Sequence, residues 1–214
     1  MKLDQLRRAE DHDLARYTKQ IQRLVADKIA DAGAHASKAL TDTLNATTEG
    51  RPTAAKVRRS ASYQAATTRL VELLDSLEEI VESCRVDTYS QAYGFWFHYH
   101  AAEMRRGSDP SPPRPLVERC RTTMIYGYTV RKFLQGPLDR ASTQLLPTLT
   151  VAGNRAVSTR DAKDSIRRWQ ETNASAIMKN AVAAVIDSQT MADRRAGRDT
   201  IKRELLHDDP QLND

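Results

Sequence analysis

Aromatic residues gather in one stretch of this chain, Tyr89-Ser-Gln-Ala-Tyr-Gly-Phe-Trp-Phe-His-Tyr-His-Ala-Ala-Glu-Met-Arg-Arg106. Tyr89, Tyr93 and Trp96 recur at the spacing of one helical face, and His100 and Met104 continue that face. A helix that is apolar around most of its circumference is a buried one. We therefore expect a central helix over about 89–106, with the other helices packed around it and with Trp96 in the core.

A strand is the alternative for part of this stretch. Phe95, Phe97 and Tyr99 alternate with Trp96 and His98, as side chains do on the two faces of a strand. The helical spacing continues on both sides of these residues, which favours the helix.

The composition also favours an all-α protein. Hydrophobic residues make up 40% of the 214 residues and aromatic residues only 6%, so most of the core must come from Leu, Ile, Val and Ala. Such a core is typical of helix-on-helix packing. Glycine and proline gather at a few places instead of recurring between short strands. We expect an irregular multi-helix bundle around the aromatic helix, with a long C-terminal helix.

Breaks in the helical pattern divide the chain into regions. We expect a bend near Gly33, an N-cap at Asp87, a helix break at Gly136-Pro137 and an N-cap at Ser158. The expected boundaries are 1–52 for N-terminal amphipathic helices, 53–156 for a helical core, 157–206 for the long C-terminal helix and 207–214 for an acidic tail.

A proline-rich segment at 107–115 interrupts the helical core. Its prolines exclude a continuous helix and favour an extended conformation. The segment is either a domain boundary or a surface strap. Aromatic residues resume soon after it, at Tyr126, Tyr128 and Phe133, which favours the strap.

The arginines form the most distinctive polar feature. Lys and Arg total 33 against 28 Asp and Glu, a mild excess that permits a polyanionic partner. Arg-Arg pairs that converge on one face would contact phosphates, whereas dispersed pairs would be solvated and paired with carboxylates. Our candidates for nucleic-acid contact are Arg58, Arg59, Arg105, Arg106, Arg167, Arg168, Arg194 and Arg195.

The apolar stripe of the C-terminal helix mixes small and polar residues with a few large ones. It has few large side chains to fill a core of its own, and Trp169 is the kind of rigid anchor that dominates protein interfaces. We expect this stripe to contact a partner protein through Trp169, Ile166, Ile177 and Val185.

Residues that carry catalysis are not arranged in a known motif. The sequence holds no G-x-S-x-G elbow, no glycine-rich phosphate loop and no H-E-x-x-H. His98 and His100 diverge by about 200° on a helix and cannot bind one metal ion together. Cys84 and Cys120 lack metal-ligand and redox spacing. We expect no enzyme activity, no cofactor and no metal site.

The N-terminus lacks the apolar region of a signal peptide, and no later apolar run reaches the length of a bilayer. The expectation is a soluble protein that is not exported and has no membrane partner.

Several segments together carry a family resemblance over about the last two-thirds of the chain. They are Tyr89–Arg106 followed by Asp109-Pro-Ser-Pro-Pro-Arg-Pro115, Phe133-Leu-Gln-Gly-Pro-Leu-Asp-Arg-Ala141, and Ser158-Thr-Arg-Asp-Ala-Lys-Asp-Ser-Ile-Arg-Arg-Trp169 with the Arg-rich helix after it. In these segments the chain resembles the helical portion of tailed-phage minor head proteins of the MuF-like kind, especially those of actinobacterial phages. The Cys/His-containing C-terminal module of that family is missing, so its effector or metal-binding roles are not carried over.

The resemblance implies a non-enzymatic structural protein inside a phage head, near the portal vertex, and in the host cytoplasm during assembly. Portal or capsid protein would be its partner, with packaged double-stranded DNA and further copies of the chain as additional partners. The alternative is a basic helical protein that binds nucleic acid on its own. An enzyme whose site is assembled from dispersed residues is a third hypothesis.

Overall fold

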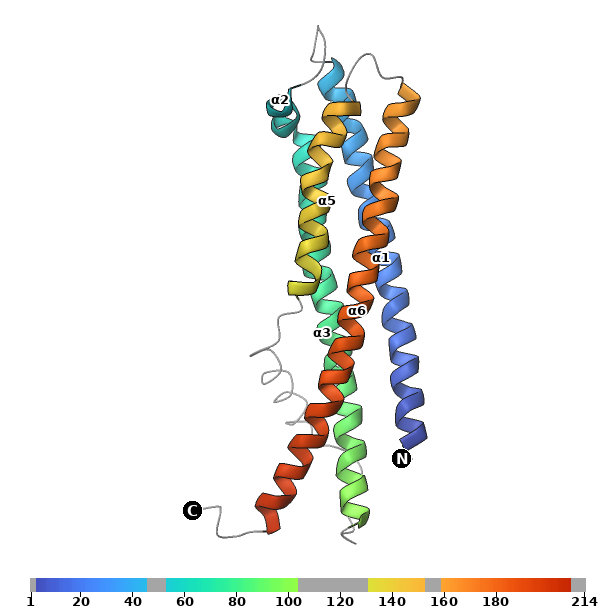
Figure 1. The fold of residues 1–214 in the computed structure, drawn as a ribbon, viewed down its shortest axis with the longest axis vertical. Coiled ribbons are helices and arrows are strands. Elements are labelled where there is room, and N and C mark those ends of the chain that lie inside the picture. The colour runs from blue at the N-terminus through green and yellow to red at the C-terminus, as the bar shows by residue number, and fades with distance from the viewer. Residues whose placement is uncertain (1–2, 46–52, 104–130, 153–158, 209–214) are drawn as a thin grey trace. The chain divides into compact units, whose positions relative to one another are not determined.

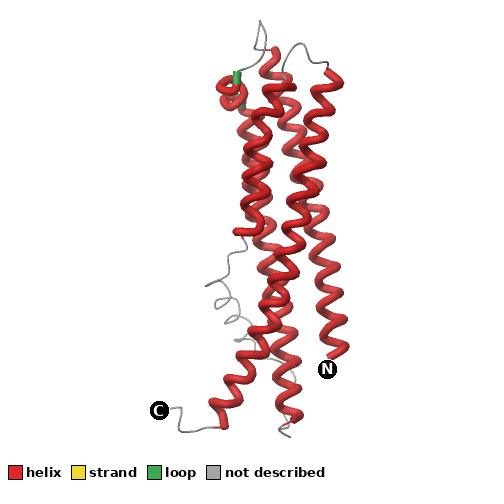
Figure 2. The backbone as a smooth tube through the Cα atoms, in the orientation of Figure 1, coloured by secondary structure: helices red, strands yellow, loops and turns green. Residues whose placement is uncertain are grey.

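The computed structural model of the chain describes residues 3–45, 53–103, 131–152 and 159–208. These ranges hold helices and no strand (Figures 1 and 2). The all-α prediction is confirmed, and the strand alternative at 95–99 is excluded. The helices are α1 (Leu3–Asn45), α2 (Ala54–Arg59), α3 (Ala61–Glu103), α5 (Arg131–Ala152) and α6 (Thr159–Asp208).

One serine separates α2 from α3. Thr53 caps α2 by accepting a hydrogen bond from the Lys56 amide at 3.3 Å. At the other end of α2, the Ser60 amide donates to the Val57 carbonyl at 3.1 Å. The Ser60 hydroxyl oxygen also accepts from the Tyr63 amide at 3.1 Å, so Ser60 ends one helix and begins the next.

The aromatic stretch is the C-terminal part of α3 and not a separate helix. No glycine or proline interrupts the sequence from Ala61 to Tyr93, so nothing breaks the hydrogen-bond ladder at Asp87. The predicted N-cap at Asp87 is wrong. Its carboxylate instead accepts from the Tyr17 hydroxyl at 2.6 Å and from Arg16 at 2.8 Å.

The break predicted at Gly136-Pro137 is also wrong, because α5 continues through both Pro137 and Pro147. An interior proline costs about 3 kcal/mol or more. Burying one leucine contributes about 1.5–3 kcal/mol, so a stripe of buried leucines offsets the two prolines. That stripe consists of Leu134, Leu138, Leu145 and Leu149.

Several other expectations lie outside the described residues. They concern the strap at 107–115, Arg105, Arg106, Cys120, the Ser158 cap and the tail after Asp208.

The chain divides into two compact units. The aromatic unit comprises Met1–Thr18, Glu79–Thr129 and Ala183–Asp214, and the leucine unit comprises Lys19–Glu78 and Val130–Val182. Consequently α1, α3 and α6 each contribute residues to both units.

In the aromatic unit, rings from α3 pack against small residues of α6. Tyr89 stacks on Tyr93 with ring centroids 6.1 Å apart, and Ala192 and Ala196 complete the buried cluster. Trp96 is only partly buried, which corrects the expectation that it lies in the core. Its indole nitrogen donates to Asp193 at 3.2 Å. Polar anchoring therefore adds to packing at this tryptophan.

In the leucine unit, mainly aliphatic residues of α1, α2, α3, α5 and α6 form the core. Short α2 packs against α5 (Figure 1), and its Val57 is buried. The larger core side chains are Ile21, Val25 and Ile29 of α1, Leu70, Leu73 and Leu77 of α3, the leucines of α5, and Ile166, Trp169 and Ile177 of α6.

Gly33 lies inside uninterrupted α1, where it makes room for a side chain of α6. The Gln170 side chain occupies the space that a Cβ atom at Gly33 would need. Its Nε2 atom donates to the Ile29 carbonyl at 3.4 Å. Close approach between helices, and not a bend, therefore explains this glycine.

Gly33→Ala should leave the free energy of unfolding within about 1 kcal/mol of the wild type, although alanine is the better helix former by about 1 kcal/mol. The new methyl group displaces the flexible end of the Gln170 side chain, which loses its hydrogen bond to the Ile29 carbonyl, a contribution of about 1 kcal/mol. In a Gln170→Ala background the same change should stabilise by about 1 kcal/mol. Urea denaturation of the two single variants and the double variant measures this coupling. Ala34→Gly, at an exposed position of α1, measures the difference in helix propensity between alanine and glycine. The prediction is contradicted if the free-energy changes of the two single variants add up to that of the double variant.

Candidate functional site

The predicted partner interface on α6 is core. Ile166, Trp169, Ile177 and Val185 are all buried within the chain, with Trp169 only 5% exposed. The Trp169 indole nitrogen donates to the Ala141 carbonyl of α5 at 3.0 Å. The small residues of α6 do permit close helix approach, but around Trp169 the approaching helix is α5 of the same chain. The interface prediction for these four side chains is therefore corrected.

The described arginine pairs are divided between the two units. Arg58 and Arg59 are exposed on α2, and Arg167 and Arg168 are exposed on α6, all within the leucine unit. In the aromatic unit, Arg194 is exposed and Arg195 partly buried. Arg167 is paired with Glu171 at 2.9 Å, as the solvated alternative anticipated.

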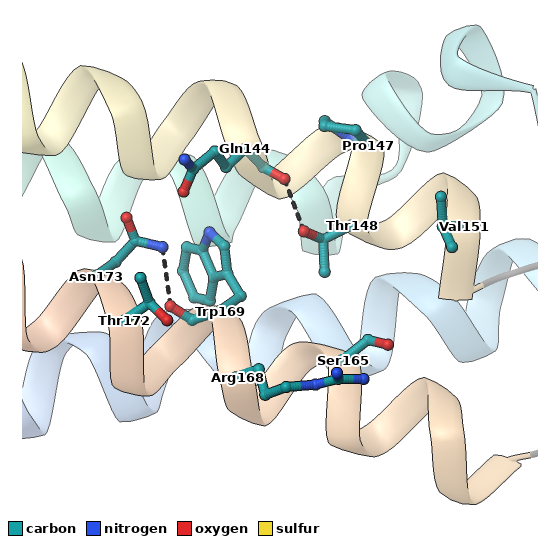
Figure 3. Close-up of a pocket in the computed structure, with 9 residues that line it drawn as sticks. All are labelled: Gln144, Pro147, Thr148, Val151, Ser165, Arg168, Trp169, Thr172 and Asn173. Carbon is teal, nitrogen blue, oxygen red and sulfur yellow. Dashed lines mark hydrogen bonds between the residues drawn. The ribbon is translucent and has the colours of Figure 1, made fainter.

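A groove of about 510 Å³ lies between α5 and α6 in the leucine unit (Figure 3). The Trp169 indole stands between the two helices, and Pro147 and Val151 lie on α5. Val151 is 51% exposed. The remaining lining residues are Gln144, Thr148, Ser165, Arg168, Thr172 and Asn173.

Two of the three hydroxyl groups that line this groove, those of Thr148 and Ser165, are bound to their own helices. Thr148 donates to the Gln144 carbonyl at 2.8 Å, and Ser165 donates to the Asp161 carbonyl at 2.8 Å. Neither hydroxyl is placed beside a general base that would activate it. The groove is therefore suited to binding and not to nucleophilic chemistry.

Among the residues that the structure describes, Arg168 is the one charged side chain that lines the groove. Its Nε atom donates to the Asp164 carbonyl at 3.3 Å. Among the described residues no carboxylate lies within ion-pair distance of Arg168, in contrast to the neighbouring Arg167 with Glu171. The groove therefore carries net positive charge.

Sequence reasoning singled out Arg168 and Trp169 but missed the groove. It expected a helix break at Gly136-Pro137, whereas the groove requires α5 to continue through Pro137 and Pro147. The signal that could have revealed the continuation is the leucine spacing of Leu138, Leu145 and Leu149 across the proline.

A network of polar residues around buried Asp13 and Tyr17 joins α1 to α3 in the aromatic unit. The Gln91 amide donates to Asp13 at 2.7 Å, and Tyr17 donates to Asp87. Arg16 bridges the two carboxylates, at 3.0 Å from Asp13 and 2.8 Å from Asp87. Since Asp13 is buried, these contacts offset the cost of removing its charge from water.

A second polar group surrounds Arg85, whose side chain is 2% exposed and forms an ion pair with Glu82. Burial lowers the pKa of Arg85, and the positive charge of Arg195 acts in the same direction.

Burial raises the pKa of Glu10, although Arg7 opposes this shift. Arg7 bonds Glu10 at 2.7 Å and Asp193 at 3.4 Å, which connects α1 to α6.

Burial raises the pKa of the Cys84 thiol to about 12. The thiolate is the reactive form. In a Cys120→Ser variant we therefore expect iodoacetamide at pH 8 to label Cys84 at least about a hundredfold more slowly than a free cysteine peptide. Mass spectrometry of native and guanidinium-unfolded samples checks this. Equal labelling rates would contradict the buried, protonated thiol.

Among the described residues, no group of three or more His, Cys, Asp or Glu side chains is placed to hold a metal ion. No described helix combines the length and apolar character that a membrane crossing needs. No family model, curated protein or solved structure matches this chain.

Proposed function

We propose that this chain is a structural protein of a tailed-phage head that binds portal or capsid protein. The observation that carries the proposal is that two of the segments responsible for the family resemblance meet in space. Phe133–Ala141 lies on α5 and Thr159–Trp169 on α6, and the bond from Trp169 to Ala141 joins them. The groove lies next to this junction. These two segments thus belong to one local structure, and that structure has a surface for a partner.

The chemistry of the groove supports binding as its role. The Thr148 and Ser165 hydroxyls are engaged by their own helices, and the exposed apolar side chains of the groove offer contact area. Exposed apolar surface beside polar residues is typical of protein contact sites.

Particles of the phage or prophage that encodes the chain provide the test. Heads purified on a density gradient should contain the chain, as detected with an antibody raised against the purified protein. It should remain with the heads after nuclease treatment and high-salt washing, because a protein partner and not DNA retains it. A chain that stays at the top of the gradient, or a gene without portal and capsid genes nearby, would overturn the proposal.

A second candidate function is binding to duplex DNA, favoured by the exposed basic residues of α2. Lys56, Arg58 and Arg59 follow one another there without an acidic neighbour in the helix. Each phosphate that they neutralise should contribute about −0.9 to the log–log slope of affinity against salt.

Replacing Arg58 and Arg59 together by glutamine should therefore make the slope less negative by about 1.8. Fluorescence anisotropy with a duplex of random sequence, at several salt concentrations, measures the slope. Exchange of exposed Lys19 and Arg23 for glutamine is a control of equal charge. Binding that does not vary with salt would exclude this function.

A further inference from the structure

We infer that the groove between α5 and α6 is the docking site of an acidic amphipathic helix from a partner protein. This inference rests on the proposed function, since it gives the chemistry of the partner that the function requires. It depends on the shape of the groove, its exposed apolar residues and its charge.

The groove can accept side chains from one face of a helix. At about 510 Å³ it holds a few side chains and not a folded domain. Trp169 contributes the edge of a buried ring, while Pro147 and Val151 supply apolar surface on α5. Helices that bind such grooves present apolar residues at i, i+3, i+4 and i+7.

Charge complementarity identifies the occupant as acidic. Arg168 is the only charged lining residue, and no described carboxylate pairs with it. A partner with carboxylates beside its apolar stripe would pair with Arg168 while its apolar residues fill the groove.

Two features disfavour other occupants. A small anion would need several donors aimed at one point, but the Thr148 and Ser165 hydroxyls donate to their own helices. Nucleic acid would contact the arginines without needing the apolar surface around Val151. The apolar and basic surfaces together match a protein helix best.

The probe is a fluorescein-labelled helical peptide of about 18 residues with leucines at i, i+3, i+4 and i+7 and glutamates on both flanks. Two control peptides replace all glutamates by lysine or all leucines by serine. Titration of the full chain, followed by anisotropy, should show saturable binding of the acidic amphipathic peptide only. Binding of the lysine peptide with equal affinity, or no binding of the acidic peptide, would overturn the inference.

Matched variants locate the site. Arg168→Glu should weaken peptide binding at least about tenfold, whereas Arg167→Glu, next in sequence but outside the groove, should change it less than about twofold. Val151→Ser should weaken binding similarly, and Val71→Ser, an equally exposed valine on α3, should not. All four positions are exposed, so the variants should keep the helical circular dichroism spectrum.

Equal losses from Arg167→Glu and Arg168→Glu would mean general electrostatic attraction and would overturn the assignment. Self-association of the chain that Val151→Ser abolishes would identify the occupant as a second copy. Displacement of the peptide by duplex DNA would identify it as nucleic acid. Either result rejects the acidic helix.

The peptide and particle experiments can fail separately. Specific peptide binding by a chain that is missing from phage heads would reject the proposed function and leave the groove assignment standing. A chain present in heads without groove-specific peptide binding would keep the function and place its contact elsewhere.

Discussion

Replacing Trp169 by alanine lowers the free energy of unfolding by about 3–5 kcal/mol, because a large buried ring is lost from the leucine core. The variant also loses the hydrogen bond from the indole to the Ala141 carbonyl. Urea denaturation followed by far-ultraviolet circular dichroism measures the change. A loss below about 1 kcal/mol would show that the ring does not hold α5 and α6 together.

Trp169→Phe is the matched control. Phenylalanine retains an aromatic ring but cannot donate to Ala141, so this variant should lose little more than one hydrogen bond and part of the packing. The hydrogen bond contributes about 1 kcal/mol. A cost equal to that of the alanine variant would mean that the indole nitrogen, and not the ring, stabilises this contact.

Replacing Glu82 by alanine destabilises the protein by about 2–4 kcal/mol, because the buried Arg85 guanidinium loses its paired carboxylate. The double variant with Arg85→Met should return to within about 1 kcal/mol of the wild type, since methionine fills the site without a charge. Exposed Glu79→Ala serves as the control and should cost less than about 0.5 kcal/mol.

The same urea experiment applied to the Glu82, Arg85 and double variants gives the interaction energy. A double variant that is as unstable as Glu82→Ala would assign the loss to the glutamate itself. In that case the destabilisation by Glu82→Ala would not come from the buried charge of Arg85.

The helical content was predictable because local signals and tertiary packing agree. The apolar spacing in α1 predicted a helix from Leu3 to about Leu44, and the structure ends it at Asn45. The long C-terminal helix was expected over 157–206 and is observed at Thr159–Asp208. In both helices the apolar stripe continues over many turns, so the period is unambiguous.

Errors arose where a local signal opposed packing. Asp87 has the side chain of a cap, yet no glycine or proline lies beside it, and the Tyr17 hydroxyl donates a hydrogen bond to its carboxylate. Pro137 and Pro147 are helix breakers by themselves, but the buried leucines of α5 outweigh them. Local propensity is a weak guide when tertiary contacts contribute more free energy.

The candidate site was less predictable than the fold because it depends on which helices pack together. The sequence identified Trp169 as an anchor but could not show that Ala141 of α5 is what it contacts. The charge of Arg168 was visible, whereas its place in a groove followed only from α5 passing Pro147.

The polar network between α1 and α3 also has a consequence for misfolding. Tyr17 bonds Asp87 and Gln91 bonds Asp13, so the two pairs lie one turn apart on antiparallel helices. Sliding one helix by a turn in one direction would bring Asp13 opposite Asp87, and a buried carboxylate would face a half-exposed one. Apolar residues alone would tolerate that shift, because leucine-like surfaces repeat every turn. The network thus selects one alignment by penalising a competing alignment, even where its own contribution to stability is small.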